Sequence, residues 1–333
     1  MSGRNWKDGL LSSSLPLEFE TAKLLAKRDF GVSADYTYGR IDNNSLKEFS
    51  VDIHAYSYPA NRVIFNLLVE CKQKSPNKKW LFLPDPNEPD WDRFIPGSTL
   101  RFVDEFSGEY FGSKDAFRRL ERQIPVAYKG TEINLAKGEV YDTDIKHGIA
   151  QLRYALPRLL REMLEDANVI GEAGLPFIMC PILVTTADLL MMNKTASLSK
   201  VTRCSNLEQL SKSVPYVILR SDYGPDFENY CRHQEFMYLT KFRDDFEANE
   251  YLKALEIRRS RIKAHVIRLP SKILRGLIDV NPFYMNRYFS QFLVVNFSQM
   301  REFMELLSKS VNQTVRTLRK LPRVKSLTKP VQN

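Results

Sequence analysis

Val63-Ile-Phe-Asn-Leu-Leu-Val-Glu-Cys-Lys72 is the stretch of sequence that decides the fold. Its apolar run predicts a buried strand, and this strand ends in an acid and an amine, Glu70 and Lys72. Ionised groups resist burial unless they are paired or bound to a metal. Because a second acid, Asp52, lies within an earlier strand-like run, the pattern favours a site that holds a divalent cation against phosphate.

The two strand-like runs predict an antiparallel hairpin. In residues 49–56 the odd-numbered positions share an apolar face, and Asp52 and His54 lie on the other face. Residues 57–62 are typical of a turn. Facing residue numbers in such a hairpin have a constant sum, which must be even if the two apolar faces are to coincide. A sum near 122 places Asp52 opposite Glu70, with Cβ atoms about 4.5–5.5 Å apart, which suits two carboxylates that share one metal.

An amphipathic helix is expected upstream, over residues 17–28, with Pro16 near its start and Gly31 soon after its last turn. The chain then presents, in order, an acid on a helix, an acid on a hairpin strand and a Glu-x-Lys strand end. These motifs are Phe19-Glu20, Val51-Asp52-Ile53 and Val69-Glu70-Cys71-Lys72-Gln73.

This series resembles the PD-(D/E)XK nuclease superfamily, and within it the Mrr-type and related restriction-endonuclease-like proteins. The order of the acids matches the family, and a spacing of about seventeen residues between Asp52 and Glu70 is ordinary for it. The likeness covers roughly residues 15–220. The chain departs from the family pattern in having no Pro before Asp52. It also lacks the Gln-x-x-x-Tyr signature of RecB-type nucleases, because Gln151 and Tyr154 stand one residue too close.

The resemblance implies a metal-dependent phosphodiesterase. Asp52, Glu70 and the backbone carbonyl of Cys71 would bind Mg²⁺, with Mn²⁺ as a substitute. The metal would generate hydroxide and offset charge on the phosphorus. Lys72 would orient or deprotonate the attacking water, or neutralise the scissile phosphate, and these roles stay open.

The same resemblance assigns roles to three further residues. Glu20 would support the two acids or complete a second metal site. The phase of the helix favours Glu20 over Glu18, because Glu20 lies nearer the apolar stripe. Gln73 and Gln151 would contact phosphate or a metal-bound water, although a glutamine at a helix start is more often a plain surface residue.

Two functions from different classes follow. The first is a Mg²⁺-dependent endonuclease that acts on double-stranded DNA, in restriction or in defence against foreign DNA. The second is a catalytically inactive nucleic-acid-binding or scaffold protein that retains the nuclease fold, and RNA is an alternative substrate for an active enzyme. The intact set of Asp52, Glu70 and Lys72 favours the first. A homodimer is an open expectation, since restriction-like enzymes often cut as dimers.

The expected fold class is α/β (α+β), with a mixed sheet flanked by helices in a restriction-endonuclease-like core. The sequence punctuation predicts a flexible N-terminus and a nuclease-like domain that carries a Pro-rich insertion. A mainly helical C-terminal region and a basic flexible tail follow. In residue numbers these parts are 1–15, 16–223 with the insertion at 74–110, 224–321 and 322–333.

Further elements are expected along the chain. Helices are predicted over residues 114–123, 144–167, around 207–211, 245–261 and 299–319, a turn at 128–130, strands at 178–186 and 216–220, and a short strand or helix start at 292–297. Within the insertion, Lys78, Lys79 and Trp80 suggest a grip on a nucleic-acid strand by phosphate contact and base stacking. A plain surface insertion is the equal alternative.

Composition agrees with a nucleic-acid-binding protein. The 333-residue chain has a formal net charge of +9 and a pI of about 9.2, which favours polyanionic partners through counterion release. The four cysteines are dispersed without a C-x-x-C pair, so neither a zinc site nor a disulfide framework is indicated. Without an N-terminal apolar core or an apolar run near twenty residues, we expect a cytoplasmic protein with no membrane partner.

Overall fold

The computed structural model describes residues 6–42, 45–85, 96–102, 112–169, 176–248 and 288–318. Its strands are β1 (Gly31–Asp42), β2 (Ser45–Ser57), β3 (Ile64–Lys72), β4 (Lys78–Pro84), β5 (Arg101–Phe102), β6 (Val126–Asn134), β7 (Glu139–Tyr141), β8 (Phe177–Thr185), β9 (Asp188–Met192), β10 (Ser211–Val214), β11 (Tyr216–Arg220) and β12 (Gln291–Asn296). In the described residues they form one mixed sheet of twelve strands. The main path runs β1-β2-β3-β8-β12-β11-β6-β4-β9-β10, while β5 pairs with β8 and β7 with β6.

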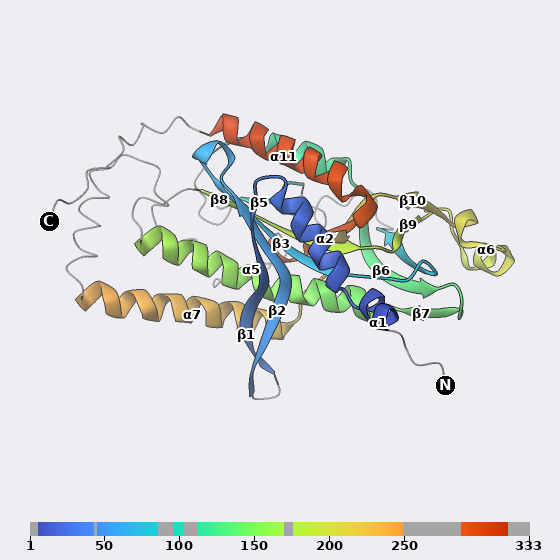
Figure 1. Ribbon diagram of the computed structural model, residues 1–333, viewed down its shortest axis with the longest axis horizontal. Coiled ribbons are helices and arrows are strands. Elements are labelled where there is room, and N and C mark those ends of the chain that lie inside the picture. The colour runs from blue at the N-terminus through green and yellow to red at the C-terminus, as the bar shows by residue number, and fades with distance from the viewer. Residues whose placement is uncertain are drawn as a thin grey trace.

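Helices cover both faces of this sheet (Figure 1). They are α1 (Trp6–Ser12), α2 (Leu15–Ala26), α4 (Asp115–Arg122), α5 (Thr143–Val169), α6 (Leu198–Arg203), α7 (Pro225–Ala248) and α11 (Met300–Thr317), with short 3-10 turns η1 (Pro59–Asn61), η2 (Leu207–Gln209) and η3 (Phe297–Gln299). Helices α5 and α7 pack on one face, and α2 and α11 lie on the other (Figure 1). The α/β class with a mixed sheet flanked by helices is therefore confirmed.

The hairpin of β2 and β3 has the register expected from hydrophobicity. Ile53 pairs with Val69 and Ser57 with Phe65, so facing residue numbers sum to 122. The even sum brings the two apolar faces together, which is the condition that sets the register of a half-buried hairpin. In the structure α5 covers the second face as well, so β3 is buried on both sides except at its ends.

Helix α5 lies between β7 and β8 in the sequence, and it packs against β8 and against β3, the parallel neighbour of β8. It coincides closely with the helix expected over residues 144–167, and β8 with the strand expected over 178–186. Every residue of β8 is buried, as is typical of a central parallel strand. Strand β11 occupies residues 216–220, as predicted, and the predicted helix at 114–123 is α4.

The expectation of a loop over the insertion at 74–110 is wrong for residues 78–84. Residues 78–84 form β4, which pairs with β6 and β9 inside the sheet, and residues 86–95 and 103–110 lie outside the described residues. The expected turn at 128–130 is also wrong, because β6 runs through it. Gly130 allows the ring of Phe82 to cross it, since a Cβ at this position would lie 2.7 Å from Phe82 Cε1.

The ends of the chain also differ from expectation. Residues 6–12 form α1, within the stretch expected to be flexible. A short strand or helix start was expected over residues 292–297, and residues 291–296 form β12 between β8 and β11. The chain on both sides of residue 223 therefore shares one sheet. The segment around 207–211 is a 3-10 turn followed by β10, whereas α6 and β9 were not foreseen.

The predicted amphipathic helix at 299–319 is α11. Its buried stripe includes Phe303, Leu307 and Val311. The helix expected over 245–261 lies outside the described residues from 249 onward, and so does the basic tail.

Candidate metal-dependent active site

Asp52 lies where the pairing of β2 with both of its neighbours is interrupted. The ladder between β1 and β2 skips the position where Asp35 faces Asp52. The ladder between β2 and β3 stops at Ile53, the residue next to Asp52. Asp35 has a left-handed backbone with φ of 54°, an uncommon conformation outside glycine. The side chain of Asp52 takes the place of a ladder bond: its Oδ2 accepts a hydrogen bond of 2.7 Å from the backbone N–H of Cys71.

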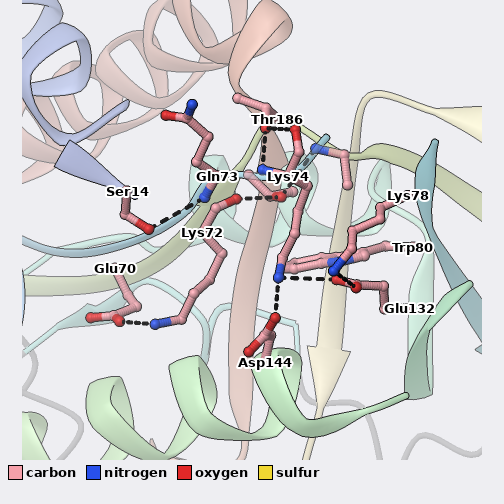
Figure 2. A network of polar contacts seen from close by, with 12 residues as sticks. Ser14, Glu70, Lys72, Gln73, Lys74, Lys78, Trp80, Glu132, Asp144 and Thr186 are labelled. Carbon is pink, nitrogen blue, oxygen red and sulfur yellow. Dashed lines mark hydrogen bonds and ion pairs between the residues drawn. The ribbon is translucent and has the colours of Figure 1, made fainter. Parts of the chain in front are cut away.

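Glu70 is fully buried at 0% exposure, and Lys72 is its cationic partner. Lys72 Nζ lies 2.6 Å from Glu70 Oε1, and the pair lies next to the strand end in Figure 2. The other carboxylate oxygen, Oε2, is buried, and no described residue gives it a hydrogen bond. Because buried polar atoms are normally paired, this oxygen is the clearest sign of an incomplete site.

The acids and the lysine perturb one another. Burial raises the pKa of Glu70 to about 7, and the negative charge of Asp52 adds to this shift, while Lys72 opposes it. Burial also raises the pKa of Asp52, against the effect of the Cys71 N–H. Burial lowers the pKa of Lys72, but the charge and hydrogen bond of Glu70 outweigh it and the net shift is upward. The lysine is therefore protonated at neutral pH.

Helix α5 approaches the site closely at Gly148. A Cβ there would lie 2.8 Å from Leu183 Cδ1 and 3.4 Å from Glu70 Cγ, so the glycine lets the helix pack directly over Glu70. One turn further, Gln151 Oε1 lies 3.4 Å from Lys72 Nζ, and Gln151 Nε2 donates to the carbonyl of Ser50 at 2.9 Å. Gln151 thus holds Lys72 in place, rather than being a plain surface residue.

The surroundings of Glu20 do not favour it as the third acid. Glu20 is exposed on α2 and pairs with Lys23 at 3.4 Å. Its neighbour Glu18 is partly buried, and its pKa is raised by burial and by the charges of Asp52 and Asp35. The buried stripe of α2 contains a threonine, Thr21, between two leucines; this polar residue hides the stripe and shifts the apparent phase of the helix.

Asp35 is a site residue that sequence reasoning missed. It faces Asp52 across the interrupted ladder, and its charge raises the pKa of Asp52. A lone acid in a long polar strand gives no sequence signal of its position. Glu18 and Asp35 are linked to Asp52 by charge, since Asp52 raises the pKa of Glu18 and Asp35 raises that of Asp52.

Gln73 binds protein rather than standing free for phosphate. Its Nε2 donates to the carbonyl of Leu11 at 2.6 Å, and its backbone N–H donates to Ser14 Oγ at 3.4 Å. Through these bonds Gln73 ties α1 and the start of α2 to the strand end that carries Lys72.

The residues expected to grip nucleic acid from the insertion are engaged elsewhere. Trp80 is fully buried, and its Nε1 donates to Glu132 Oε2 at 3.2 Å. The expectation that this ring stacks on a base is therefore wrong. Lys78 Nζ lies 2.6 Å from Glu132 Oε1, and Lys79 forms an ion pair with Asp188. Both lysines remain partly exposed, but each has an acidic partner within the sheet.

The donor atoms at the strand end fit a hard divalent cation. No group of three or more His, Cys, Asp or Glu side chains converges on a metal position within the described residues, which does not match the closed ligand set of a structural zinc site. Mg²⁺ needs less from the protein, because it keeps several waters and is bound through one or two carboxylates. Asp52 and Glu70 could supply these carboxylates, and Glu70 Oε2 has no partner among the described residues.

Comparison with known proteins gives no relative: no family model, no curated protein and no solved structure matches the chain. Among the described helices, none has the length and apolar character needed to cross a membrane. The functional class must therefore be inferred from the mixed sheet and from the cluster of acids and lysine at the end of β3.

Proposed function

We propose that the protein is a metal-dependent endonuclease that hydrolyses phosphodiester bonds in DNA. One observation carries the proposal: Glu70 is a fully buried carboxylate with one oxygen paired to Lys72 and the other without a partner among the described residues. The charge of Asp52 also acts on Glu70 and raises its pKa. A buried acid in this state is costly unless a further cation joins it. The order of α2, the β1–β3 strands, α5 and β8 supports the likeness to restriction-endonuclease-like proteins.

Asp52 and Glu70 would hold the Mg²⁺ ion, with Mn²⁺ as a substitute and the carbonyl of Cys71 as a further ligand. When bound, the metal supplies an activated water and offsets charge on the phosphorus. Glu70, whose pKa is raised to about 7, would bind the cation in its ionised form, because a positive charge nearby favours the carboxylate.

Lys72 acts as a cation rather than as a base in this proposal. Its pKa is raised, so the amine carries its proton and cannot accept another. The ammonium group, fixed by Glu70 and Gln151, neutralises the scissile phosphate or orients the attacking water. Gln151 is a positioning residue, since it reaches the reaction only through Lys72.

The experiment is cleavage of supercoiled plasmid in Mg²⁺ by the wild type and by Asp52→Asn and Lys72→Met. Glu20→Gln is the matched control, because Glu20 is a solvent-exposed acid on the neighbouring helix. We expect the two site variants to lose at least about 100-fold in rate, the order seen when a group that stabilises a transition state is removed. Equal rates for wild type and site variants would refute the enzyme.

A second candidate is a catalytically inactive nucleic-acid-binding protein with the same fold. One observation favours it: Asp52 accepts a hydrogen bond from the Cys71 N–H, which gives this carboxylate a structural role in the hairpin. Gel-shift measurements on duplex DNA in Ca²⁺ separate the two. Binding without cleavage in Ca²⁺, and cleavage after exchange into Mg²⁺, support the nuclease. Binding that never leads to cleavage of DNA, or of structured RNA tested in parallel, supports the inactive protein.

A further inference from the structure

Lys74 forms the centre of a second charge network, two residues beyond Lys72. Its ammonium group is paired with Asp144 in the first turn of α5 and lies 3.1 Å from Glu132 Oε2 on β6, as Figure 2 shows. The backbone of Lys74 is held as well, since its N–H donates to Thr186 Oγ1 at 2.7 Å and its carbonyl accepts from the same hydroxyl at 3.0 Å. Lys74 therefore has little freedom to move.

The two acidic partners of Lys74 differ in their surroundings. Glu132 is buried and fully engaged, because Oε1 lies 2.6 Å from Lys78 Nζ and Oε2 accepts from Trp80 Nε1 at 3.2 Å. Asp144 has a side chain that is 44% exposed, and it forms an ion pair with Lys74. Glu132 is thus held by several partners, whereas Asp144 could form an ion pair with a neighbouring cation if Lys74 were removed.

Lys72 is such a neighbour. The charge of Asp144 contributes to the raised pKa of Lys72, and the charge of Lys72 contributes to the lowered pKa of Asp144. The lysine side chain is a compact charge on a flexible stem, and ion pairs near the surface require less desolvation than buried ones. Without Lys74, the half-exposed Asp144 would compete with buried Glu70 for the same ammonium group.

We infer that Lys74 is a positioning residue: by occupying Asp144 and Glu132 it fixes the first turn of α5 and leaves Lys72 on Glu70. The inference rests on the proposed function for its consequence in catalysis, but not for the choice of ion-pair partners. The two lysines at this strand end would then have different roles: Lys72 acts on the reacting phosphate, and Lys74 fixes the surrounding ion pairs.

The partner choice is tested without any activity, by urea unfolding of the full chain. A double-mutant cycle with Lys72→Met and Asp144→Asn measures the coupling of these residues. We expect a coupling below about twofold in the unfolding constant when Lys74 is present, and above about fivefold in the Lys74→Met background. An unchanged coupling in the two backgrounds would overturn the inference.

The consequence for catalysis is tested with plasmid cleavage by the same variants. We expect Lys74→Met to lose about tenfold in kcat with little change in KM, about the effect of 1.4 kcal/mol on a barrier. Lys74→Met with Asp144→Asn should recover most of the rate, because the competing acid is gone, and Lys74→Arg should also be near wild type. If Lys74→Met lost activity only because it failed to fold, adding Asp144→Asn would not restore the rate. The control is Lys146→Met, which removes the exposed ion pair of Lys146 with Asp142 at the same end of α5.

The two proposals fail in different ways. If the wild type cuts neither DNA nor RNA, the function is refuted while the unfolding cycle still decides the partner choice. If the wild type cuts and Lys74→Met is not rescued by Asp144→Asn, the positioning role is refuted while the nuclease stands.

Discussion

Asp52 Oδ2 accepts a hydrogen bond of 2.7 Å from the backbone N–H of Cys71, the residue that stands between Glu70 and Lys72. The bond closes the hairpin at the point where its ladder has ended. It also fixes the strand segment from which the acid and the lysine both project. Asp52 is therefore placed to serve the fold and the site at once, and variants of this residue can separate the two roles.

Asp52→Ala and Asp52→Asn should differ in stability and agree in activity. Alanine leaves the Cys71 N–H without its acceptor, which costs about 1–3 kcal/mol for a buried donor. Asparagine keeps an acceptor oxygen but loses the charge. We expect urea unfolding to show the loss only for alanine, and plasmid cleavage to be lost in both. Equal destabilisation by the two variants would mean that the carboxylate charge, rather than the hydrogen bond, holds the strand.

Glu70→Gln should stabilise the metal-free protein more at pH 8 than at pH 5. The pKa of Glu70 rises from 4.5 to about 7 in the folded state, so between these values the folded protein binds more protons than the unfolded chain, and stability falls as pH rises. Glutamine removes this cost, which amounts to no more than about 3 kcal/mol.

Thermal unfolding of both proteins over this pH range, in EDTA, is the measurement. The difference in Tm should widen through the window between pH 4.5 and 7 and then level off. Excess Mg²⁺ should narrow it at pH 8 by stabilising the wild type, since the cation replaces the missing partner of Glu70 Oε2. Parallel curves for the two proteins would show that Glu70 has an ordinary pKa.

Glu18→Gln should reduce plasmid cleavage and Glu20→Gln should not. Glu18 interacts with the charge of Asp52, whereas Glu20 pairs with Lys23 in solvent. We expect a loss of about tenfold for Glu18→Gln, equivalent to about 1.4 kcal/mol in the barrier, with both variants folded by circular dichroism. The reverse order of effects would restore Glu20 as the third acid.

Gly148→Ala should destabilise the protein although alanine favours helices. The added methyl would meet Leu183 Cδ1 at 2.8 Å beneath α5, and overpacking of a core costs about 1–3 kcal/mol. Gly9→Ala in α1 is the control, because a Cβ there has no atom within 4 Å. Urea unfolding should show a loss for the first variant only. Equal stability of both would indicate that α5 can move away from β3 freely.

Trp80→Phe should affect stability and leave nucleic-acid binding intact. The ring is buried and donates to Glu132, so loss of this bond and of packing should cost about 1–3 kcal/mol. Trp6→Phe is the control at a site that is 77% exposed. A gel-shift titration that weakened for Trp80→Phe without any change in unfolding would restore the stacking role.

The hairpin shows what the sequence could predict. Residues alternate with an exact period of two along a strand, so the parity of apolar positions alone gave the register in which Ile53 pairs with Val69. Strands such as β8 and β11 were found for a similar reason, because a short apolar run bounded by polar residues or turns reports on its own burial.

Contacts between distant segments are what the sequence could not show. The ring of Phe82 packs against Gly130 on the neighbouring strand. A glycine that by itself favours a turn is therefore needed here to make room for an aromatic ring. Thr21 is buried against the other side of β3, with its hydroxyl 3.9 Å from Cys71 Sγ, and a polar residue in a buried stripe misleads any reading of helix phase. Asp35 enters the site only because β1 pairs beside Asp52.

Strand β12 is synthesised late, although it lies in the middle of the sheet. It is the last strand of the described chain, more than seventy residues after Tyr216 begins β11, yet it pairs with both β8 and β11. A nascent chain on the ribosome that has not reached Gln291 therefore carries two half-sheets, each with an open edge, and open edges invite pairing with other chains. The half-sheet that carries Glu70 can therefore join the other half-sheet through β12 only after translation has passed Asn296.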